Sequence, residues 1–243
     1  MDFDHYSSNY DEVLTRHLAF AGGGALWYAR QKALRLAGLA RARWEGPVRV
    51  LDVGCGAGLM LRSLDPEVFP EPCGTDVSAG MVEATRAAIP HARVLPCPPG
   101  GALPFEDDSF DLAYASCTVQ HVPGPQRPGF FREMARVTRP GGLVVVFEHN
   151  PWNPVTRSIV ARCEFDEGSV LLSAPEVQTL AREAGLQPEP ARYYLFVPPR
   201  LGCLRFLERF LHWLPLGGQY LAVAGKPGRG TAQDPGAGRG LSR

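Results

Sequence analysis

The chain has 243 residues, and its 25 basic residues balance its 25 acidic ones. A balanced charge provides no field that would gather nucleic acid or an anionic membrane surface, so we expect no nucleic-acid partner. No apolar run reaches the length of about 18 residues that a membrane span needs, and the first residues lack the basic and apolar regions of a signal peptide. We therefore expect no transmembrane segment and a cytoplasmic location.

The six cysteines show no C-x-x-C spacing and no spacing with histidine that is typical of a metal site. Neither a zinc site nor a disulfide framework is predicted from this pattern. We interpret the cysteines mostly as small buried hydrophobic residues.

The N-terminal part of the chain, residues 11–43, is rich in Ala, Leu and Arg and predicts helical stretches with breaks at Gly22–Gly24 and at Gly38. From Val48 onward, segments typical of strands alternate with segments typical of helices. The expected strands are Val48–Val53, Pro72–Asp76, Arg93–Leu95, Phe110–Ala115, Leu143–Glu148, Tyr193–Val197 and Gln219–Ala224. The expected helices are Leu59–Leu64, Met81–Ala88, Gly129–Val137, Ala174–Ala184 (with Ser173 as its N-cap and Gly185 as its stop) and Leu201–Leu214. This alternation predicts βαβ units and a mainly parallel sheet, that is, an α/β fold.

The stretch "VRVLDVGCGAGLML", residues 48–61, places a glycine-rich turn between the first strand and the next apolar segment. Such a turn lets a ligand approach the backbone at the edge where open α/β sheets bind ligands. The third glycine of a dinucleotide-binding fingerprint is replaced by Leu59, and the G-K-[ST] of a phosphate-binding loop is absent. The turn follows Asp52, and a second acid, Asp76, ends the next expected strand. This arrangement suits a ligand that has a ribose diol and no phosphates.

Four segments together resemble the class I S-adenosylmethionine-dependent methyltransferases, of the methyltransferase type 11 kind. They are "VLDVGCGAG", "GTDVSAGMVEAT", "LPFEDDSFDLAYASCTVQHV" and "EMARVTRPGGLVVVFEHNP", in that order. The resemblance covers residues 48–150 and, more weakly, extends to residue 226. It implies a Rossmann-like sheet of seven strands with helices on both faces and a C-terminal antiparallel strand, which would be Gln219–Ala224.

The resemblance also implies a role for individual residues toward the cofactor S-adenosylmethionine. Gly54, Cys55 and Gly56 would lie under its methionine part, with Gly58 completing the loop, and Asp76 would accept hydrogen bonds from both ribose hydroxyls. Asp52 would brace the loop, Val77 and Met81 would pack on the adenine, and Ser116 would line the passage to the sulfonium. Three of these residues also have a purely structural interpretation: Asp76 as a helix cap, Met81 as a core residue and Ser116 as a packing residue.

One departure from the family pattern stands in the segment "VLPCPPGGALPF", residues 94–105. Relatives often place there an acid that accepts from the adenine amino group, but Pro99 occupies this position. Proline has neither a side-chain acceptor nor a backbone N–H. Adenine is then expected to contact the backbone around Gly100 and Gly101, with lower affinity, or another residue that the sequence does not identify.

Two histidines are candidate bases, because both follow expected strands at the carboxyl edge of the sheet. His149 follows "LVVVF" and His121 follows "SCTVQ". A hydroxyl acceptor benefits from a base, whereas a neutral amine can lose its proton after transfer. We predict His149 as the main base and His121 as the weaker candidate; each has an alternative role in shaping a loop.

We expect one domain over residues 1–226: a helical cover (1–46), a cofactor-binding core (47–150) and a substrate-side insert with the last strands (151–226). Residues 227–243 are expected to be a disordered tail. The cover brings Tyr6, Tyr10, Trp27 and Tyr28, and either Arg30 or Lys32 would meet the cofactor carboxylate. The apolar face of Leu201–Leu214 predicts packing on the sheet, with a membrane-surface or homodimer contact as the alternative.

The predicted function is methyl transfer from S-adenosylmethionine to a small-molecule acceptor, with O-methylation favoured. The acceptor is expected to be lipid-like or aromatic, and a membrane-surface contact of residues 201–214 would suit a lipid-like one. Two alternatives stay open. One is a cofactor-binding protein of the same fold without turnover, and the other is an NAD-binding oxidoreductase, which Leu59 disfavours.

Overall fold

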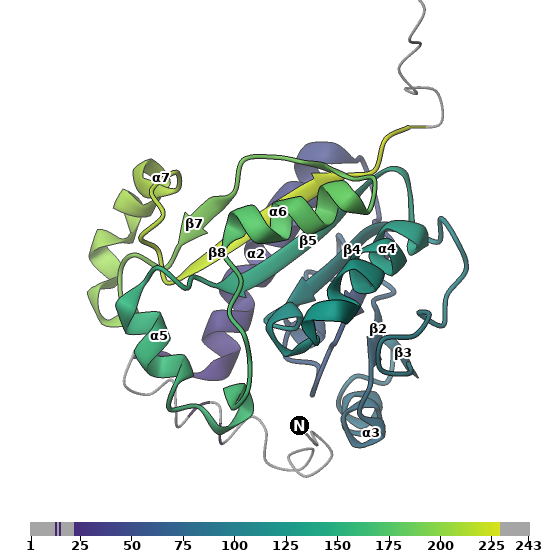
Figure 1. Ribbon diagram of the computed structural model, residues 1–243, viewed down its shortest axis with the longest axis horizontal. Helices are drawn as coiled ribbons and strands as arrows, with labels where there is room; N and C mark the ends of the chain where they lie inside the picture. Colours follow the sequence, from purple (N-terminus) through teal and green to yellow (C-terminus); the bar gives the residue numbers. More distant parts are fainter. Residues whose placement is uncertain (1–12, 14, 16–21, 229–243) are drawn as a thin grey trace, which may run out of the picture.

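A computed structural model describes residues 13, 15 and 22–228 of the chain (Figure 1). Tyr6 and Tyr10 of the expected cover and residues 229–243 of the expected tail lie outside the described residues. Lys226, the last residue of the expected domain, is anchored: its ammonium lies 2.7 Å from Asp108 Oδ1 and 2.7 Å from the Thr138 carbonyl oxygen.

The described residues form an eight-stranded sheet in the order β3-β2-β1-β4-β5-β8-β6, with β7 also paired to β8. The strands are β1 (Val50–Val53), β2 (Cys73–Asp76), β3 (Arg93–Pro96), β4 (Phe110–Ser116), β5 (Thr138–His149), β6 (Gln187–Pro188), β7 (Arg192–Tyr194) and β8 (Gln219–Gly225). Strands β1 to β5 pair in parallel, and β8 is antiparallel to β5, β6 and β7. The predicted C-terminal antiparallel strand is thereby confirmed. The sheet has eight strands rather than seven because two short strands, separated by a segment that contains Pro190, share the far edge of β8.

Helices cover both faces of the sheet. They are α2 (Ala25–Arg43), α3 (Ala79–Ala88), α4 (Arg127–Val137), α5 (Pro154–Val160), α6 (Ala174–Glu183) and α7 (Glu208–Leu211), together with the short 3-10 helices η3 (Leu61–Ser63), η4 (Val119–His121), η5 (Gly124–Gln126), η6 (Glu164–Asp166) and η7 (Pro199–Leu207). Figure 1 shows α4 and α6 on the near face and α2 behind the sheet. A capping box between Ser173 and Glu176 starts α6, and Gly185 follows its end at a φ of 80°, as predicted.

The alternation of side chains along the strands builds one core on each face. Along β4, Leu112 and Tyr114 join the core that contains α2, whereas Ala113 and Ala115 join the core that contains α4 and α6. This is the pattern expected of a strand whose successive side chains point to opposite faces. The two cores fix the strands, so that their carboxyl ends form a stable edge.

Two expected helices are wrong. Leu59–Leu64 forms only a turn followed by η3, because Gly58 has a φ of 76° before it and Asp65 precedes a proline, which disfavours helical backbone. Leu201–Leu214 is broken into η7 and α7, with non-helical angles at Leu201, next to Gly202. The expected continuous apolar face is therefore absent.

Two further expectations also need correction. Gly38 does not interrupt α2. Its neighbours Leu36, Ala37 and Ala40 are buried in the core, and the free energy of their burial outweighs the cost of about 1 kcal/mol of a glycine inside a helix. The strand expected over Tyr193–Val197 ends at Tyr194, because Leu195 adopts a left-handed φ of 61°. Among the described residues, no helix is long and apolar enough to cross a membrane.

Candidate active site

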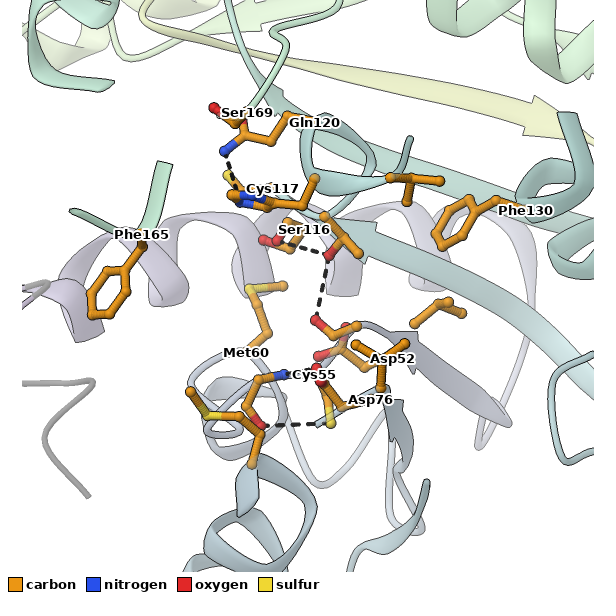
Figure 2. A pocket seen from close by; sticks show the side chains of 18 of the residues that line it. Asp52, Cys55, Met60, Asp76, Ser116, Cys117, Gln120, Phe130, Phe165 and Ser169 are labelled. Atoms are coloured by element: carbon orange, nitrogen blue, oxygen red, sulfur yellow. Dashed lines mark hydrogen bonds between the residues drawn. The ribbon is translucent and has the colours of Figure 1, made fainter. Parts of the chain in front are cut away.

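A cavity of about 560 Å³ lies at the carboxyl ends of β1, β2, β4 and β5, where open α/β sheets bind ligands. Its wall is built from residues within the segments 25–32, 52–60, 76–81, 97–103, 116–133 and 163–169, together with His149 and Gln219. Figure 2 shows Asp52, Cys55 and Asp76 toward one end of this space and Gln120 and Ser169 toward the other. The expected cover and insert thus both contribute to the cavity wall.

The turn after β1 is shaped by three glycines with positive φ angles: 79° at Gly54, 51° at Gly56 and 76° at Gly58. A Cβ at Gly54 would lie 2.3 Å from Thr118 Cγ2, and one at Gly58 would lie 2.8 Å from Thr85 Cγ2. A Cβ at Gly56 would meet no atom within 4 Å, although Gly56 lines the cavity. The backbone at Gly56 therefore leaves room for a ligand, whereas Gly58 packs on α3 and lies outside the cavity wall.

Asp76 joins the turn to the start of α3. Its Oδ2 accepts a hydrogen bond from the Gly56 amide at 2.8 Å, and its Oδ1 accepts one from the Ser78 amide at 2.9 Å. The N-cap of α3 is Ser78, whose hydroxyl oxygen accepts from the Met81 amide at 3.0 Å. Asp76 thus holds the turn and also faces the cavity, and the cap that the sequence left open for Asp76 belongs to Ser78.

Asp52 is buried beneath the turn. Its Oδ2 accepts from the Tyr114 hydroxyl at 2.9 Å, while its Oδ1 has no hydrogen-bond partner among the described residues. Burial raises the pKa of Asp52 to about 7, against the lowering effect of the Tyr114 hydrogen bond. The hydrogen bond of Asp52 joins it to β4 rather than to the loop that it was expected to brace.

A cluster of polar side chains lies where α2, β4, β5 and β8 meet. The Lys32 ammonium donates to Ser116 Oγ at 2.8 Å and lies 3.1 Å from Cys117 Sγ. Gln219 Nε2 lies 3.3 Å from His149 Nδ1 and 4.0 Å from Cys117 Sγ. Burial alone would raise the pKa of Cys117, but His149 and Lys32 lower it to about 6. Burial alone would lower the pKa of His149, but the thiolate beside it raises it to about 9.

His121 belongs to a second polar cluster in the cavity wall. Its Nε2 lies 3.5 Å from Asp166 Oδ1 and 3.2 Å from Gln120 Nε2, and Gln120 Nε2 donates to Asp166 Oδ1 at 2.5 Å. Burial lowers the pKa of His121, with Asp166 acting in the opposite direction. Gln120 Oε1 and Ser169 Oγ are buried without a hydrogen-bond partner among the described residues. This end of the cavity therefore offers a neutral imidazole and unsatisfied polar atoms.

The other end of the cavity is bordered by a loop after β3 and by the start of α3. Pro98, Pro99 and Gly101 line it, and the Gly101 amide donates back to the Pro98 carbonyl oxygen at 3.1 Å. Val77 lines the cavity with an exposure of 51%, whereas Met81 lines it from a buried position with an exposure of 1%. These residues give this part of the wall a mainly apolar surface, without a carboxylate at position 99.

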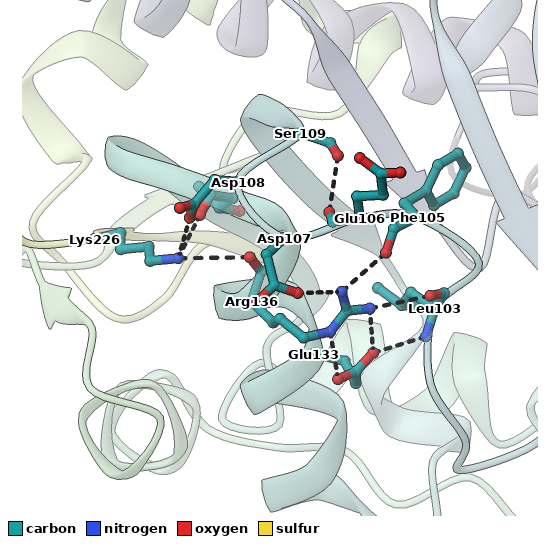
Figure 3. Close-up of polar contacts among 10 residues, drawn as sticks. Leu103, Phe105, Glu106, Asp107, Asp108, Ser109, Glu133, Arg136 and Lys226 are labelled. Atoms are coloured by element: carbon teal, nitrogen blue, oxygen red, sulfur yellow. Dashed lines mark hydrogen bonds and ion pairs between the residues drawn. The ribbon is translucent and has the colours of Figure 1, made fainter.

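Arg136 of α4 holds the end of this loop (Figure 3). Its guanidinium donates to the carbonyl oxygens of Leu103 at 3.0 Å and Phe105 at 2.9 Å, and it pairs with Glu133 and Asp107, each at 2.8 Å. Glu133 Oε2 in turn accepts from the Leu103 amide at 2.7 Å. The loop is thereby fixed to the helix layer rather than hanging free over the cavity.

Most residues predicted for the site do line one cavity: Asp52, Gly54, Cys55, Gly56, Asp76, Val77, Met81, Ser116, His121 and His149. Lys32 lines the cavity, whereas Arg30 is exposed and does not. The sequence did not indicate Cys117, Gln120, Asp166 or Gln219. The position of Cys117 directly after a strand that ends at this edge was a usable signal for Cys117 alone.

Comparison with known proteins places these features in a family. The methyltransferase domain family matches residues 51–146. An uncharacterised methyltransferase of Mycobacterium leprae is 38% identical over 103 residues, which cover 40% of this chain and 35% of the relative. Tocopherol O-methyltransferase of Arabidopsis thaliana is 31% identical over 124 residues, covering 48% of this chain and 34% of the relative. The matched segment thus spans about a third of the length of these relatives.

Solved structures share the fold over most of the chain. A SAM-dependent methyltransferase of Thermotoga maritima superposes with a TM-score of 0.64 at 19% identity, covering 92% of this chain and 97% of that chain. A TehB-like SAM-dependent methyltransferase of Corynebacterium glutamicum gives a TM-score of 0.59 at 18% identity, covering 91% and 98%. Residues 51–146 thus match the methyltransferase domain family, and the fold around them is that of solved S-adenosylmethionine-dependent methyltransferases.

Proposed function

We propose that the chain transfers a methyl group from S-adenosylmethionine to a hydroxyl of a small-molecule acceptor held in the same cavity. The observation that carries the proposal is that one cavity joins the turn and Asp76 at one end to His121 and Asp166 at the other. Methyl transfer needs the two reactants side by side in one site, and a single cavity can hold both.

The residues at the turn fit the cofactor. The open space beside Gly56 would admit its methionine part, and Asp76, whose carboxylate faces the cavity, would accept from the ribose hydroxyls. Val77 and Met81 would pack on the adenine, and Lys32 is the basic residue that would meet the carboxylate. When bound, the cofactor supplies a methyl group on a sulfonium, which is a good leaving group.

His121 is the better candidate for the base. Its lowered pKa keeps the imidazole neutral at pH 7, and a neutral imidazole carries a basic lone pair on one ring nitrogen. The raised pKa of His149 instead favours the protonated ring, which has no lone pair to offer. The base role thus moves from His149, which the sequence favoured, to His121.

Three observations bear on the acceptor. The name of the Arabidopsis relative specifies O-methylation, which supports a hydroxyl acceptor for this chain. The acceptor end combines Phe165 with the unsatisfied atoms of Gln120 and Ser169, which suits an apolar or aromatic compound that carries a polar group. Exposed apolar side chains on η7, α7 and the following turn, among them Phe206, Phe210 and Trp213, support contact with a lipid-like acceptor surface or a second copy.

A methyl-transfer screen tests the proposal. The full chain is incubated with methyl-labelled cofactor and a metabolite extract, and labelled products are identified by mass spectrometry. We expect a labelled small molecule with the methyl on oxygen, and we expect His121→Ala to abolish most of the label. Cofactor binding without any labelled product would favour a binding protein of the same fold, an alternative that Pro99 motivates.

A further inference from the structure

Exposed apolar side chains gather at one end of the sheet, beyond β7. Among the described residues, nine of the twelve large apolar side chains that stay exposed belong to the segments 150–163 and 195–218. They include Trp152, Val155, Phe206, Phe210, Trp213 and Leu216, with exposures from 50% to 67%. Single exposed apolar residues need no explanation, whereas a contiguous patch of them marks an interaction site.

The two segments adjoin each other and form one surface. The Asn153 side chain at the start of α5 donates to the Leu216 carbonyl oxygen at 2.7 Å. The Trp152 ring stacks on Tyr193 of β7 with 6.5 Å between the ring centroids, and the Tyr193 amide donates to the His212 carbonyl oxygen at 2.7 Å. Figure 1 shows α5 and α7 on the same side of the molecule. We call the exposed side chains of these two segments the α5/α7 surface.

The fold itself turns these apolar side chains outward. Glu208 of α7 points inward, where it lies 3.5 Å from the Arg35 guanidinium of α2 and accepts from the Val197 amide at 3.2 Å. Its neighbours Leu207 and Phe210 are exposed at 38% and 58%, against 9% for Glu208. A helix on the surface of a globular protein normally buries its apolar residues and exposes its charges. The reversed arrangement, which an ion pair holds in place, indicates that the apolar side chains face a partner.

The α5/α7 surface is positively charged, although the chain as a whole is neutral. The sequence of the two segments contains five arginines and a single acid, Glu208, which is paired with Arg35. Arg157, Arg162 and Arg209 are exposed, and they form no ion pair within the part of the chain that the structure describes. Their charges are therefore available to the anions of a partner.

This combination of apolar and basic side chains separates two kinds of partner. In a two-fold contact between copies of the chain, the arginines of the surface would approach the same arginines of the other copy, without an exposed acid between them. A bilayer that contains anionic lipids instead offers phosphates to the arginines and an apolar interior to the aromatic rings. The Trp213 indole N–H already donates to the Phe210 carbonyl oxygen at 2.9 Å, so the ring can enter an apolar phase without an unsatisfied donor.

We propose that the α5/α7 surface binds the face of a lipid bilayer that contains anionic phospholipids. The aromatic and aliphatic side chains enter the boundary between headgroups and acyl chains, and the exposed arginines contact the lipid phosphates. The contact is peripheral and needs no membrane-spanning helix. It is made through α7, which the ion pair between Arg35 and Glu208 ties to α2, the helix that also supplies Lys32 to the cavity wall.

Co-sedimentation of the full chain with lipid vesicles tests the proposal. Vesicles of phosphatidylcholine alone are compared with vesicles in which phosphatidylglycerol replaces part of the phosphatidylcholine, at low and at high salt. We expect the partition coefficient at low salt to be at least about tenfold higher on the vesicles with phosphatidylglycerol, because the arginines gain anionic partners. This difference should shrink at high salt, which screens the arginines from the phosphates.

Two double variants separate the apolar part of the surface from the charged part. We expect Phe210→Ser combined with Trp213→Ser to lower binding to the anionic vesicles by at least about tenfold, because two apolar rings no longer enter the bilayer. Arg157→Gln combined with Arg209→Gln should lower it by about 25-fold at low salt, at about fivefold per arginine. Val170→Ser is the matched control, since Val170 is as exposed as Phe210, at 58%, but lies outside the two segments.

Fluorescence quenching shows whether the rings enter the bilayer. Lipids with brominated acyl chains quench a tryptophan that lies among those chains. We therefore expect Trp213→Phe, which keeps an apolar ring, to retain most of the vesicle binding and to lose part of the quenching. Trp44→Phe is the control and should leave the quenching unchanged, because Trp44 packs against the core instead.

The wild-type measurements decide the proposal even if a variant fails to fold, which circular dichroism checks. Absence of binding to the anionic vesicles would overturn the proposal, and so would equal binding to both kinds of vesicle or binding without quenching. Light scattering of the chain alone examines the other occupant: a dimer that the Phe210→Ser and Trp213→Ser variant converts to a monomer would assign the surface to a second copy. Since none of these measurements needs a cofactor or an acceptor, their failure is distinct from that of the proposed methyltransferase function.

Discussion

At the scale of single residues, Asp76 connects the chain's own architecture to its proposed ligand. Both of its oxygens accept backbone hydrogen bonds, one from Gly56 and one from Ser78, so its position is fixed before any ligand arrives. A carboxylate oxygen has more than one lone pair, and those that remain can accept from hydroxyl groups in the cavity. Preorganisation of this kind lowers the entropic cost of binding.

We predict that Asp76→Ala weakens the binding of both S-adenosylmethionine and S-adenosylhomocysteine by about 1–3 kcal/mol, because the ribose hydroxyls lose a charged acceptor. Isothermal titration calorimetry measures the change. Asp65→Ala is the matched control, since Asp65 pairs with Arg41 away from the cavity. Binding of NAD in place of either ligand would contradict the cofactor assignment.

We also predict that His121→Ala lowers turnover by a factor of about 10²–10⁴, the usual range for loss of a general base, and leaves cofactor affinity within about threefold. Because its pKa lies below the ordinary histidine value, the wild-type rate should rise with pH in the acidic range and be flat by pH 7. His149→Ala should lower turnover less. The assignment fails if His121→Ala turns over acceptor at the wild-type rate.

At the scale of elements, the loop from Cys97 to Leu103 carries Pro99 at the position where the family resemblance would place an acid. Arg136 fixes the end of the loop through two carbonyl oxygens, and the turn between Pro98 and Gly101 fixes its start. Pro99 lies between these points, exposed and facing the cavity. A side chain placed there can therefore reach the cavity without moving the loop.

We predict that Pro99→Asp tightens cofactor binding or leaves it unchanged, because the new carboxylate would accept from the adenine amino group. Calorimetry with S-adenosylhomocysteine gives the affinity, and circular dichroism checks the fold. Pro98→Asp serves as the control from the neighbouring position. A marked loss of affinity in folded Pro99→Asp would mean that adenine does not lie against this loop.

The elements that the sequence predicted well are those whose signals are local. The strand before the turn, the N-cap at Ser173 and the strand that contains Tyr220 follow from apolar runs and cap residues within a few positions. Helix α5 was missed, although Asn153 before Pro154 is a usual helix start, and the Asn153 side chain does accept from the Thr156 amide. The prediction at Gly38 failed because tertiary packing overrides the local preference of glycine against helix. The helix predicted over residues 201–214 failed because tertiary packing does not support the local preference for helix there.

The candidate site shows the same division. The turn glycines and Asp76 could be predicted, since they belong to motifs that are contiguous in sequence. The Cys117 cluster could not, because Lys32, His149 and Gln219 approach Cys117 only through the order of the strands in the sheet. A residue pair separated by 85 or 102 positions, as Cys117 is from Lys32 and Gln219, leaves no periodic signal.

At the scale of the whole molecule, the stability of the fold is linked to pH through buried carboxyl groups. Glu148 is buried in the sheet, with Oε1 accepting from the Val119 amide at 2.8 Å and Oε2 without a partner among the described residues. Burial raises its pKa from 4.5 to about 8. Between these pH values the folded state holds a proton that the unfolded chain has released, so folding stability falls as pH rises.

We predict that Glu148→Gln flattens this dependence, because the amide cannot ionise while its oxygen can still accept from Val119. The wild type should lose up to about 1.4 kcal/mol per pH unit from this group between pH 5 and 8, as measured by urea unfolding. As pH rises, the raised pKa of His149 makes the folding stability fall, whereas the lowered pKa of Cys117 makes it rise over nearly the same pH range. These two contributions therefore oppose each other. Glu183→Gln, on the exposed side of α6, is the control. An unchanged slope in Glu148→Gln would show that Glu148 is already ionised.

The position of β8 has a consequence for synthesis on the ribosome. This strand is the last in the described chain, yet it lies between β5 and the short strands β6 and β7 (Figure 1). Until residues 219–225 emerge, β5 presents one edge of unpaired backbone groups and apolar side chains such as Val144 and Val146. Unpaired edges of this kind are sites of aggregation. The nascent chain thus presents an aggregation-prone edge from the time β5 emerges until residues 219–225 become available.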